Sequence, residues 1–246
     1  MNLLVVGAGS MGQWLARALA EDAPRPVEPV FLDASQQAAR EAAESVEGRA
    51  VEPATNERFD AVCIAVPIPA AKAAIERYGP LADEAVFDVT GTMTEPLQAM
   101  ERHVPNLARA SYHPLFAPAN EPGNVPVAVA SRGAAIDVVN STLDTRGNAV
   151  FETTAAEHDQ AMETVQARTH AAILAFALAS EEVPEGFHTP VSAALSDLAH
   201  QVTSGEARVY ADIQAAFDGA ADVAEAAAAL AAADDEEFER LYEEAR

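Results

Sequence analysis

The chain has 246 residues, half of them hydrophobic, and its 15 Lys and Arg against 39 Asp and Glu give a formal net charge of −24. This length suffices for a large core in one or two domains. The acidic excess argues against binding nucleic acid or anionic lipid, because both need a basic surface. A single cysteine, Cys63, leaves neither an intrachain disulfide nor a cysteine cluster for a metal. No apolar run is long enough to span a membrane, and the N-terminus has no basic leader, so we expect a cytoplasmic protein.

The basic residues are almost all of one kind. Lys72 is the single lysine and the other fourteen are arginines. Many carboxylates, almost no lysine and abundant alanine are typical of proteins from a salt-loaded cytoplasm, where a Debye length of about 3 Å weakens repulsion between surface acids. We therefore predict a halophilic protein.

The first half of the chain alternates strand and helix patterns. Strands are predicted at 3–6, 30–33, 60–66, 85–89, 127–130 and 149–152, and helices at 11–21, 35–46, 70–78, 95–102 and 134–143. Between 111 and 126 stand four prolines, which predict an ordered loop rather than a strand or helix. This alternation predicts an α/β fold with a Rossmann-type, doubly wound, mostly parallel sheet.

The second half carries helical patterns alone. Helices are predicted at 157–179, with Thr154 as a possible cap, and at 191–203 and 206–217; 221–246 is alanine-rich and then acidic. We predict a dinucleotide-binding domain over residues 1–152 and an all-helical substrate and dimerisation domain over 153–246. The apolar faces of so thin a helical domain predict a homodimer.

A glycine turn follows the first strand and opens the first helix. Gly7 permits a tight turn, Gly9 lets the backbone approach a pyrophosphate, and Gly12 allows the helix to pack closely on the strand. The free N–H groups of Ser10 and Met11 at the helix start favour phosphate charge. This spacing in this context predicts a dinucleotide site.

Two further segments fit the same cofactor. Asp33 ends the second strand, 21 positions after Gly12, where a carboxylate would accept hydrogen bonds from ribose hydroxyls. A 2′-phosphate would be repelled there, so NAD is favoured and NADP stays an alternative. Val66, Pro67 and Ile68 end the central strand and are predicted to form the wall near the nicotinamide half.

Several motifs, in order, resemble those of prephenate dehydrogenases. They are Ser111-Tyr112-His113-Pro114-Leu115-Phe116-Ala117-Pro118, Asp88-Val89-Thr90, Glu95 to Met100, Glu157-His158-Asp159-Gln160 with His170 downstream, and Arg208 to Ile213. The similarity covers residues 1 to about 217. It implies oxidation of a small molecule, prephenate, by hydride transfer to NAD(P), with loss of carbon dioxide, to 4-hydroxyphenylpyruvate for tyrosine synthesis. It also implies that His113 is the catalytic histidine and that His170 faces the substrate, while His158 and Asp159 are expected to brace the start of their helix.

The sequence departs from this family at two places. Gly91 stands where the family usually has a serine and Met93 where it has a lysine, so Thr90 or Thr92 is expected to supply a hydroxyl to the substrate. Gln201 stands at the position of the substrate-carboxylate arginine and cannot form a bidentate ion pair. The candidates for a replacement cation are Arg168, Arg208, Arg132, a protonated His200 and a residue of a dimer partner.

Other functions stay open. Arogenate, whose side chain is zwitterionic, would suit a less basic pocket with Gln201. An imine or 3-hydroxyacid oxidoreductase could share the glycine turn, although it would leave the segment around His113 unexplained. A regulatory dinucleotide-binding homologue without catalysis is the third alternative, and retention of His113 and His170 argues against it.

Overall fold

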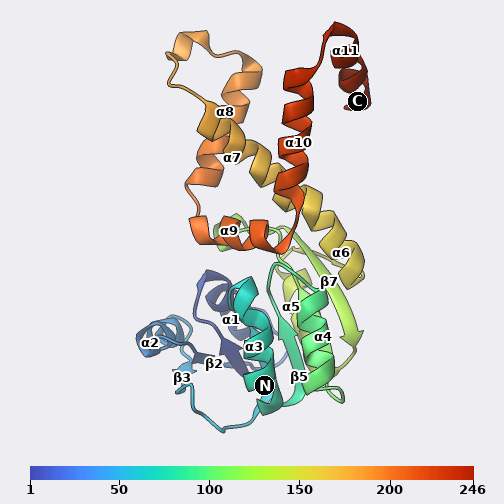
Figure 1. The fold of residues 1–246 in the computed structure, drawn as a ribbon. Coiled ribbons are helices and arrows are strands. Elements are labelled where there is room, and N and C mark those ends of the chain that lie inside the picture. The colour runs from blue at the N-terminus through green and yellow to red at the C-terminus, as the bar shows by residue number, and fades with distance from the viewer. The chain divides into compact units, whose positions relative to one another are not determined.

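The computed structural model describes all 246 residues, which form two compact units, 1–159 and 160–246. The first unit is an α/β domain and the second is helical (Figure 1). None of the helices is both long enough and apolar enough to cross a membrane. The division expected after residue 152 assigns cofactor binding to the first part and substrate binding to the second, and it stays a prediction.

The first unit is built on one eight-stranded sheet in the order β3-β2-β1-β4-β5-β6-β7-β8. Its strands are β1 (Asn2–Val6), β2 (Glu28–Leu32), β3 (Arg49–Ala50), β4 (Phe59–Ile64), β5 (Ala82–Asp88), β6 (Ala108–Tyr112), β7 (Asn124–Ser131) and β8 (Ala149–Glu152). β1 to β6 pair in parallel, whereas β7 runs antiparallel to β6. The order of β1 to β6 is that of a Rossmann fold, which confirms the predicted fold class.

Helices cover both faces of this sheet. They are α1 (Ser10–Asp22), α2 (Gln36–Glu44), α3 (Ile68–Tyr78), α4 (Thr94–His103) and α5 (Ala134–Thr145). Leu15, Ala39 and Val139 bury the faces of α1, α2 and α5 in one core cluster, and Ile75 and Met100 bury those of α3 and α4 in the other. Because both faces are covered, central strands such as β4 are apolar on both sides.

The segment from 111 to 126 corrects one prediction. Ser111 and Tyr112 belong to β6, and Pro126 lies inside β7 instead of a loop. Pro126 lacks an N–H, but its carbonyl still accepts a hydrogen bond from the backbone N–H of His113 at 3.1 Å. A strand with a neighbour on each side therefore accommodates this proline.

The second unit is a set of helices with a small core. The predicted helix 157–179 is divided into α6 (Ala155–Met162), a π-helical segment (Glu163–Arg168) and α7 (Thr169–Ala179). It is followed by α8 (Pro190–Thr203), α9 (Ala207–Ala216), α10 (Gly219–Ala232) and α11 (Asp235–Glu244). Ile173, Ala199 and Val202 form a small buried cluster between α7 and α8.

Candidate active site

The carboxyl ends of β1, β4, β5 and β6 meet at one edge of the parallel sheet. The glycine turn follows β1, Val66 to Ile68 follow β4, Val89 to Met93 follow β5, and His113 follows β6. Ligands of open α/β sheets bind at this edge, where loops diverge from the strand ends. Sequence segments more than 100 residues apart are thus brought to a single edge.

The three glycines of the turn meet different surroundings. Gly7 has φ +108°, and a Cβ there would lie 2.2 Å from the Ala65 carbonyl oxygen. At Gly12 a Cβ would lie 2.3 Å from the Gly7 carbonyl oxygen, so helix α1 packs directly on its own turn. Gly9, the N-cap of α1, has no atom within 4 Å of its Cβ position and no side chain capping the helix. Open space above uncapped N–H groups is the arrangement that a dinucleotide pyrophosphate requires, so these residues fit the cofactor.

Asp33 supports the turn as well as its expected ligand. One carboxylate oxygen accepts a hydrogen bond from the Ala8 N–H and the other accepts one from the Ser35 N–H, each at 2.8 Å. Each oxygen has a second lone pair, so the partly exposed carboxylate retains capacity for a ribose hydroxyl.

The wall predicted after β4 connects the glycine turn with His113. A Cβ at Gly7 would lie 3.2 Å from Val66 Cγ1, and one at Gly91 would lie 2.9 Å from Ile68 Cδ1. The same position at Gly91 is 3.9 Å from His113 Nε2. Pro67 is the N-cap of α3 and is exposed. The structure thus brings Val66 to the turn and places Ile68 beside the glycine that borders the imidazole.

His113 is buried and is the first member of a chain of three polar side chains. Its Nδ1 lies 2.9 Å from His158 Nε2, and His158 Nδ1 lies 2.9 Å from Asp159 Oδ1. Asp159 in turn accepts hydrogen bonds from the backbone N–H groups of Met93 at 2.9 Å and Thr94 at 3.0 Å. The carboxylate therefore caps α4, because these N–H groups begin that helix.

This contact corrects the role expected of His158 and Asp159. They do not brace the start of α6: Thr154 caps that helix by accepting a hydrogen bond from the Glu157 N–H at 3.2 Å. Sequence reasoning missed their contact with His113, because 45 residues separate the two histidines. The adjacent His-Asp pair was a signal for a polar network, but its partner depends on the fold.

Burial determines how the central groups ionise. Burial first, and the His158 ring second, lower the pKa of His113 to about 3, and the Asp159 charge only partly opposes them. For Asp159, burial raises the pKa, but hydrogen bonds from His158, Thr94 and Met93 outweigh it, so the net pKa is lowered. The site thus combines a neutral imidazole with a charged carboxylate at neutral pH.

The two threonines predicted to bind substrate are both buried after β5, but their hydroxyls differ. The Thr90 hydroxyl donates to Asp88 Oδ1 at 2.6 Å, whereas the Thr92 hydroxyl has no partner within the protein. Asp88 is fully buried, and burial raises its pKa to about 7 despite hydrogen bonds from the backbone N–H and the hydroxyl of Thr90. Thr92 is therefore the better placed of the two to bond an added molecule.

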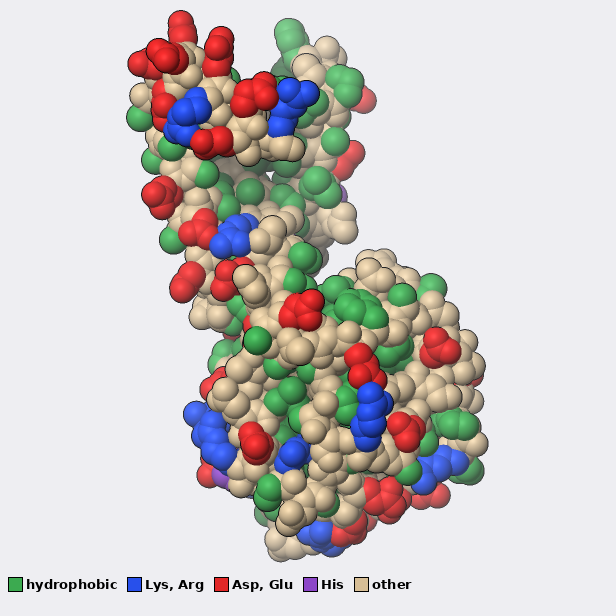
Figure 2. Space-filling model, turned by 90° about the vertical axis from the view of Figure 1, so that its right-hand side faces the viewer, with side chains coloured by type: hydrophobic (Ala, Val, Ile, Leu, Met, Phe, Trp, Pro, Cys, Tyr) green, Lys and Arg blue, Asp and Glu red, His purple; other side chains and the backbone are tan.

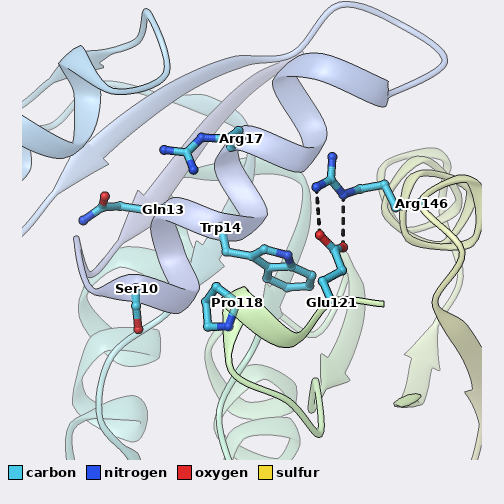
Figure 3. A pocket seen from close by; sticks show the side chains of 7 residues that line it. All are labelled: Ser10, Gln13, Trp14, Arg17, Pro118, Glu121 and Arg146. Carbon is cyan, nitrogen blue, oxygen red and sulfur yellow. Dashed lines mark hydrogen bonds and ion pairs between the residues drawn. The ribbon is translucent and has the colours of Figure 1, made fainter. Parts of the chain in front are cut away.

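A pocket of about 280 Å³ lies along α1 beside the glycine turn (Figure 3). Ser10, Gln13 and Arg17 line it from the helix, and Pro118 and Glu121 lie across from them. Its remaining lining residues are Trp14 and Arg146. Arg146 Nη2 and Glu121 Oε2 are 2.7 Å apart, and a second bond between the two groups fixes the guanidinium. The pocket thus lies next to the start of α1, where Ser10 belongs to the glycine turn.

The second unit holds the other residues predicted to bind substrate. His170 on α7 is half-buried, with its ring edge-to-face against Tyr210 at a centroid distance of 4.9 Å and its Nδ1 buried without a partner. Gln201 on α8 is exposed, as is His200.

The candidate replacement cations are already paired. Arg168 lies 2.6 Å from Asp222 in the second unit, where Arg208 is 3.9 Å from Asp212. Arg132 of the first unit bonds Glu152 at 2.6 Å. The structure does not single out one of them to replace the missing arginine.

No family model matches the chain, but individual proteins do. It is 29% identical to a 4-amino-4-deoxyprephenate dehydrogenase of Streptomyces pristinaespiralis, over 99% of this chain and 89% of that protein. A prephenate dehydrogenase of A. aeolicus, solved with hydroxyphenyl propionate and NAD+, has a TM-score of 0.71 at 15% identity, covering 92% of this chain and 86% of that one. An arogenate dehydrogenase of Synechocystis has a TM-score of 0.64 at 17% identity, covering 99% and 97%. The two solved structures, at 15% and 17% identity, show that the chain shares their fold, and the name of the Streptomyces relative agrees with the resemblance of the motifs.

Proposed function

We propose that the protein is an NAD(P)-dependent dehydrogenase that decarboxylates prephenate oxidatively to 4-hydroxyphenylpyruvate. The observation that carries this proposal is the continuous wall from the glycine turn through Val66 and Ile68 to Gly91 and the buried His113. It leads from the dinucleotide cradle to a neutral imidazole at the same sheet edge.

The residues of this chain have separable tasks. Gly9, Ser10 and Met11 hold the pyrophosphate at the start of α1, and Asp33 holds the adenosine ribose, which favours NAD over NADP. The nicotinamide ring, when bound, supplies the hydride acceptor.

His113 handles the proton of the same step. Its imidazole accepts the proton of the ring hydroxyl as the hydride leaves the hydroxyl-bearing carbon. After the carbon dioxide has left and the ring is aromatic, the imidazole returns that proton to the phenol oxygen. Thr92, His170 and Gln201 are proposed to contact the substrate, and Thr90 to position Asp88.

A second substrate is favoured by Gly91. The Streptomyces relative is named for a substrate that carries an amino group in place of the ring hydroxyl. In this chain, glycine replaces the expected serine next to His113 Nε2, so the surroundings of the reacting substituent differ at that position. 4-Amino-4-deoxyprephenate is therefore the second candidate, and arogenate the third because Gln201 is uncharged.

The test is a matrix of three substrates against two cofactors. Purified protein at high salt receives prephenate, 4-amino-4-deoxyprephenate or arogenate with NAD+ or NADP+, and reduced nicotinamide and the aromatic product are measured. We expect the highest kcat/KM for prephenate with NAD+, and a loss of about 10²–10⁴-fold in His113→Ala. The control is His103→Ala, an exposed histidine on α4. Cofactor binding without turnover of any substrate would favour a regulatory protein instead.

We also propose a homodimer formed through the second unit, in a salt-rich cytoplasm. Leu178, Phe187 and Val191 are 78–88% exposed there, whereas the α7–α8 core cluster has only three buried residues, each still 8% exposed. Apolar surface of this kind marks an interaction site.

A second copy is the proposed occupant, because a unit with so small a core needs further burial. Sedimentation equilibrium should give about twice the 25.8 kDa chain mass. Leu178→Glu should weaken the dimer at least tenfold, whereas Ala20→Glu, at an exposed position on α1, should not. A wild-type monomer at micromolar concentration would contradict the proposal.

A further inference from the structure

We propose that His158 and Asp159 are positioning residues that hold the His113 imidazole in the tautomer whose Nε2 accepts a proton. The effect on the reaction rate rests on the proposed function, whereas the tautomer itself follows from the arrangement of three side chains. His113, His158 and Asp159 form one hydrogen-bonded chain, with 2.9 Å at each link.

The direction of the chain is determined at its carboxylate end. The backbone N–H groups of Met93 and Thr94 donate to the two oxygens of Asp159, and backbone N–H groups cannot accept. Asp159 is therefore an ionised acceptor toward all its neighbours, including His158. A lone pair of His158 Nδ1 facing this carboxylate would be repelled, so Nδ1 carries the proton.

This assignment propagates to His113. In a neutral imidazole with Nδ1–H, Nε2 has a lone pair, so His158 Nε2 accepts the hydrogen bond at 2.9 Å. The donor in that bond is His113 Nδ1–H, which leaves the lone pair of His113 on Nε2. The side chain of His158 is completely buried, so both bonds of this ring lie inside the protein.

The atom selected in this way faces the side where the substrate is proposed to bind. His113 Nε2 lies 3.9 Å from the Cβ position of Gly91, at the end of the wall that leads from the glycine turn. A reversed chain would present an N–H to the ring hydroxyl and could not accept its proton. The carboxylate thus determines, through two bonds, whether the imidazole acts as a base.

The sharpest test reads the tautomer directly. In protein labelled with 15N-histidine at pH 8 without ligand, long-range 1H–15N spectra should show His113 and His158 protonated at Nδ1 and unprotonated at Nε2. In Asp159→Asn, the amide can keep its oxygen on the Thr94 N–H and turn its NH2 group toward His158 Nδ1, with loss of the bond from the Met93 N–H, and this reverses both rings. Asp144→Asn, at an exposed position on α5, is the matched control and should leave both tautomers unchanged. An Nε2–H tautomer or an imidazolium at His113 or His158 in the wild type overturns the proposal.

Kinetics separate positioning from a merely structural role. Asp159→Asn should lower kcat about 10²-fold or more with little change in the KM for NAD+, and His158→Gln should retain more activity than His158→Phe. Glutamine can accept the His113 Nδ1–H with its side-chain oxygen, whereas phenylalanine cannot. Equal activity of the two His158 variants at equal thermal stability would contradict positioning. If the wild type turns over no substrate, the proposed function fails, but the tautomer measurement still decides this inference.

Discussion

Gly9 and Gly12 stand three residues apart in one turn, yet they are glycines for different reasons. Nothing lies within 4 Å of a Cβ at Gly9, whereas a Cβ at Gly12 would lie 2.3 Å from a backbone oxygen. The φ of Gly9 is −71°, which any residue adopts. The smallness of Gly9 therefore serves the ligand, and that of Gly12 serves the fold.

A pair of alanine variants tests this difference. The free energy of unfolding of Gly9→Ala should lie within about 1 kcal/mol of the wild-type value, because the added Cβ enters open space. The variant should nevertheless bind NAD+ at least tenfold more weakly. Gly12→Ala should lose about 1–3 kcal/mol of stability from overpacking. Thermal unfolding and NAD+ titration followed by calorimetry measure both effects. Wild-type affinity in Gly9→Ala would contradict a pyrophosphate above this residue.

The pH profile should report the buried imidazole. Burial, followed by the effect of His158, lowers the pKa of His113 to about 3, so the base stays neutral well below the ordinary histidine pKa of 6.5. The acid limb of kcat/KM due to His113 should therefore lie more than one unit below pH 6.5. Asp88 titrates near pH 7, so the profile is measured both in the wild type and in Asp88→Asn. A limb at 6.5 or above that persists in Asp88→Asn would show an imidazole exposed to water.

Helices and strands with a strong local signal could be predicted from the sequence, whereas those that depend on tertiary contacts could not. The apolar run over 60–66 and the glycine turn predicted β4 and the start of α1, because each signal lies within its own segment. β6 was missed, and Pro126 was placed in a loop, because strand pairing supplies what their local sequence lacks. The link from His113 to His158 likewise depends on which strand ends meet. The residues predicted to bind the cofactor lie on one local motif and two strand ends, so local patterns were enough to single them out as candidates.

The end of β5 carries a buried acid whose ionisation should affect stability. Burial raises the pKa of Asp88 to about 7 from 3.8, so between these values the folded chain holds a proton that the unfolded chain has lost. Its contribution to stability therefore increases as the pH falls from above 7 toward 4. Asp88→Asn cannot ionise and keeps an oxygen for the Thr90 N–H.

This variant should be more stable than the wild type above pH 7, by an amount on the order of a few kcal/mol, and the difference should shrink toward pH 4. Urea unfolding at pH 5 and pH 8.5 measures it. Asp144→Asn, at an exposed position, serves as the control and should show no such change. A difference that is independent of pH would mean that the Asp88 carboxyl keeps its ordinary pKa in the folded chain.

For the whole molecule, the net charge of −24 dominates the response to salt. Figure 2 shows acidic side chains spread over the viewed face of both units, with basic side chains among them. Raising the KCl concentration from 0.1 M to 1 M shortens the Debye length from about 10 Å to about 3 Å, which removes most repulsion between carboxylates that do not touch.

We expect Tm to rise by about 5–10 °C over this range of KCl concentration, because 1 kcal/mol of stability corresponds to about 2–4 °C for a chain of this size. Sucrose at matched osmolality stabilises by exclusion without screening, so it should give a smaller rise. Because a shorter Debye length acts on every carboxylate pair at once, a Tm that fell as KCl was added would mean that attractive ion pairs outweigh this repulsion.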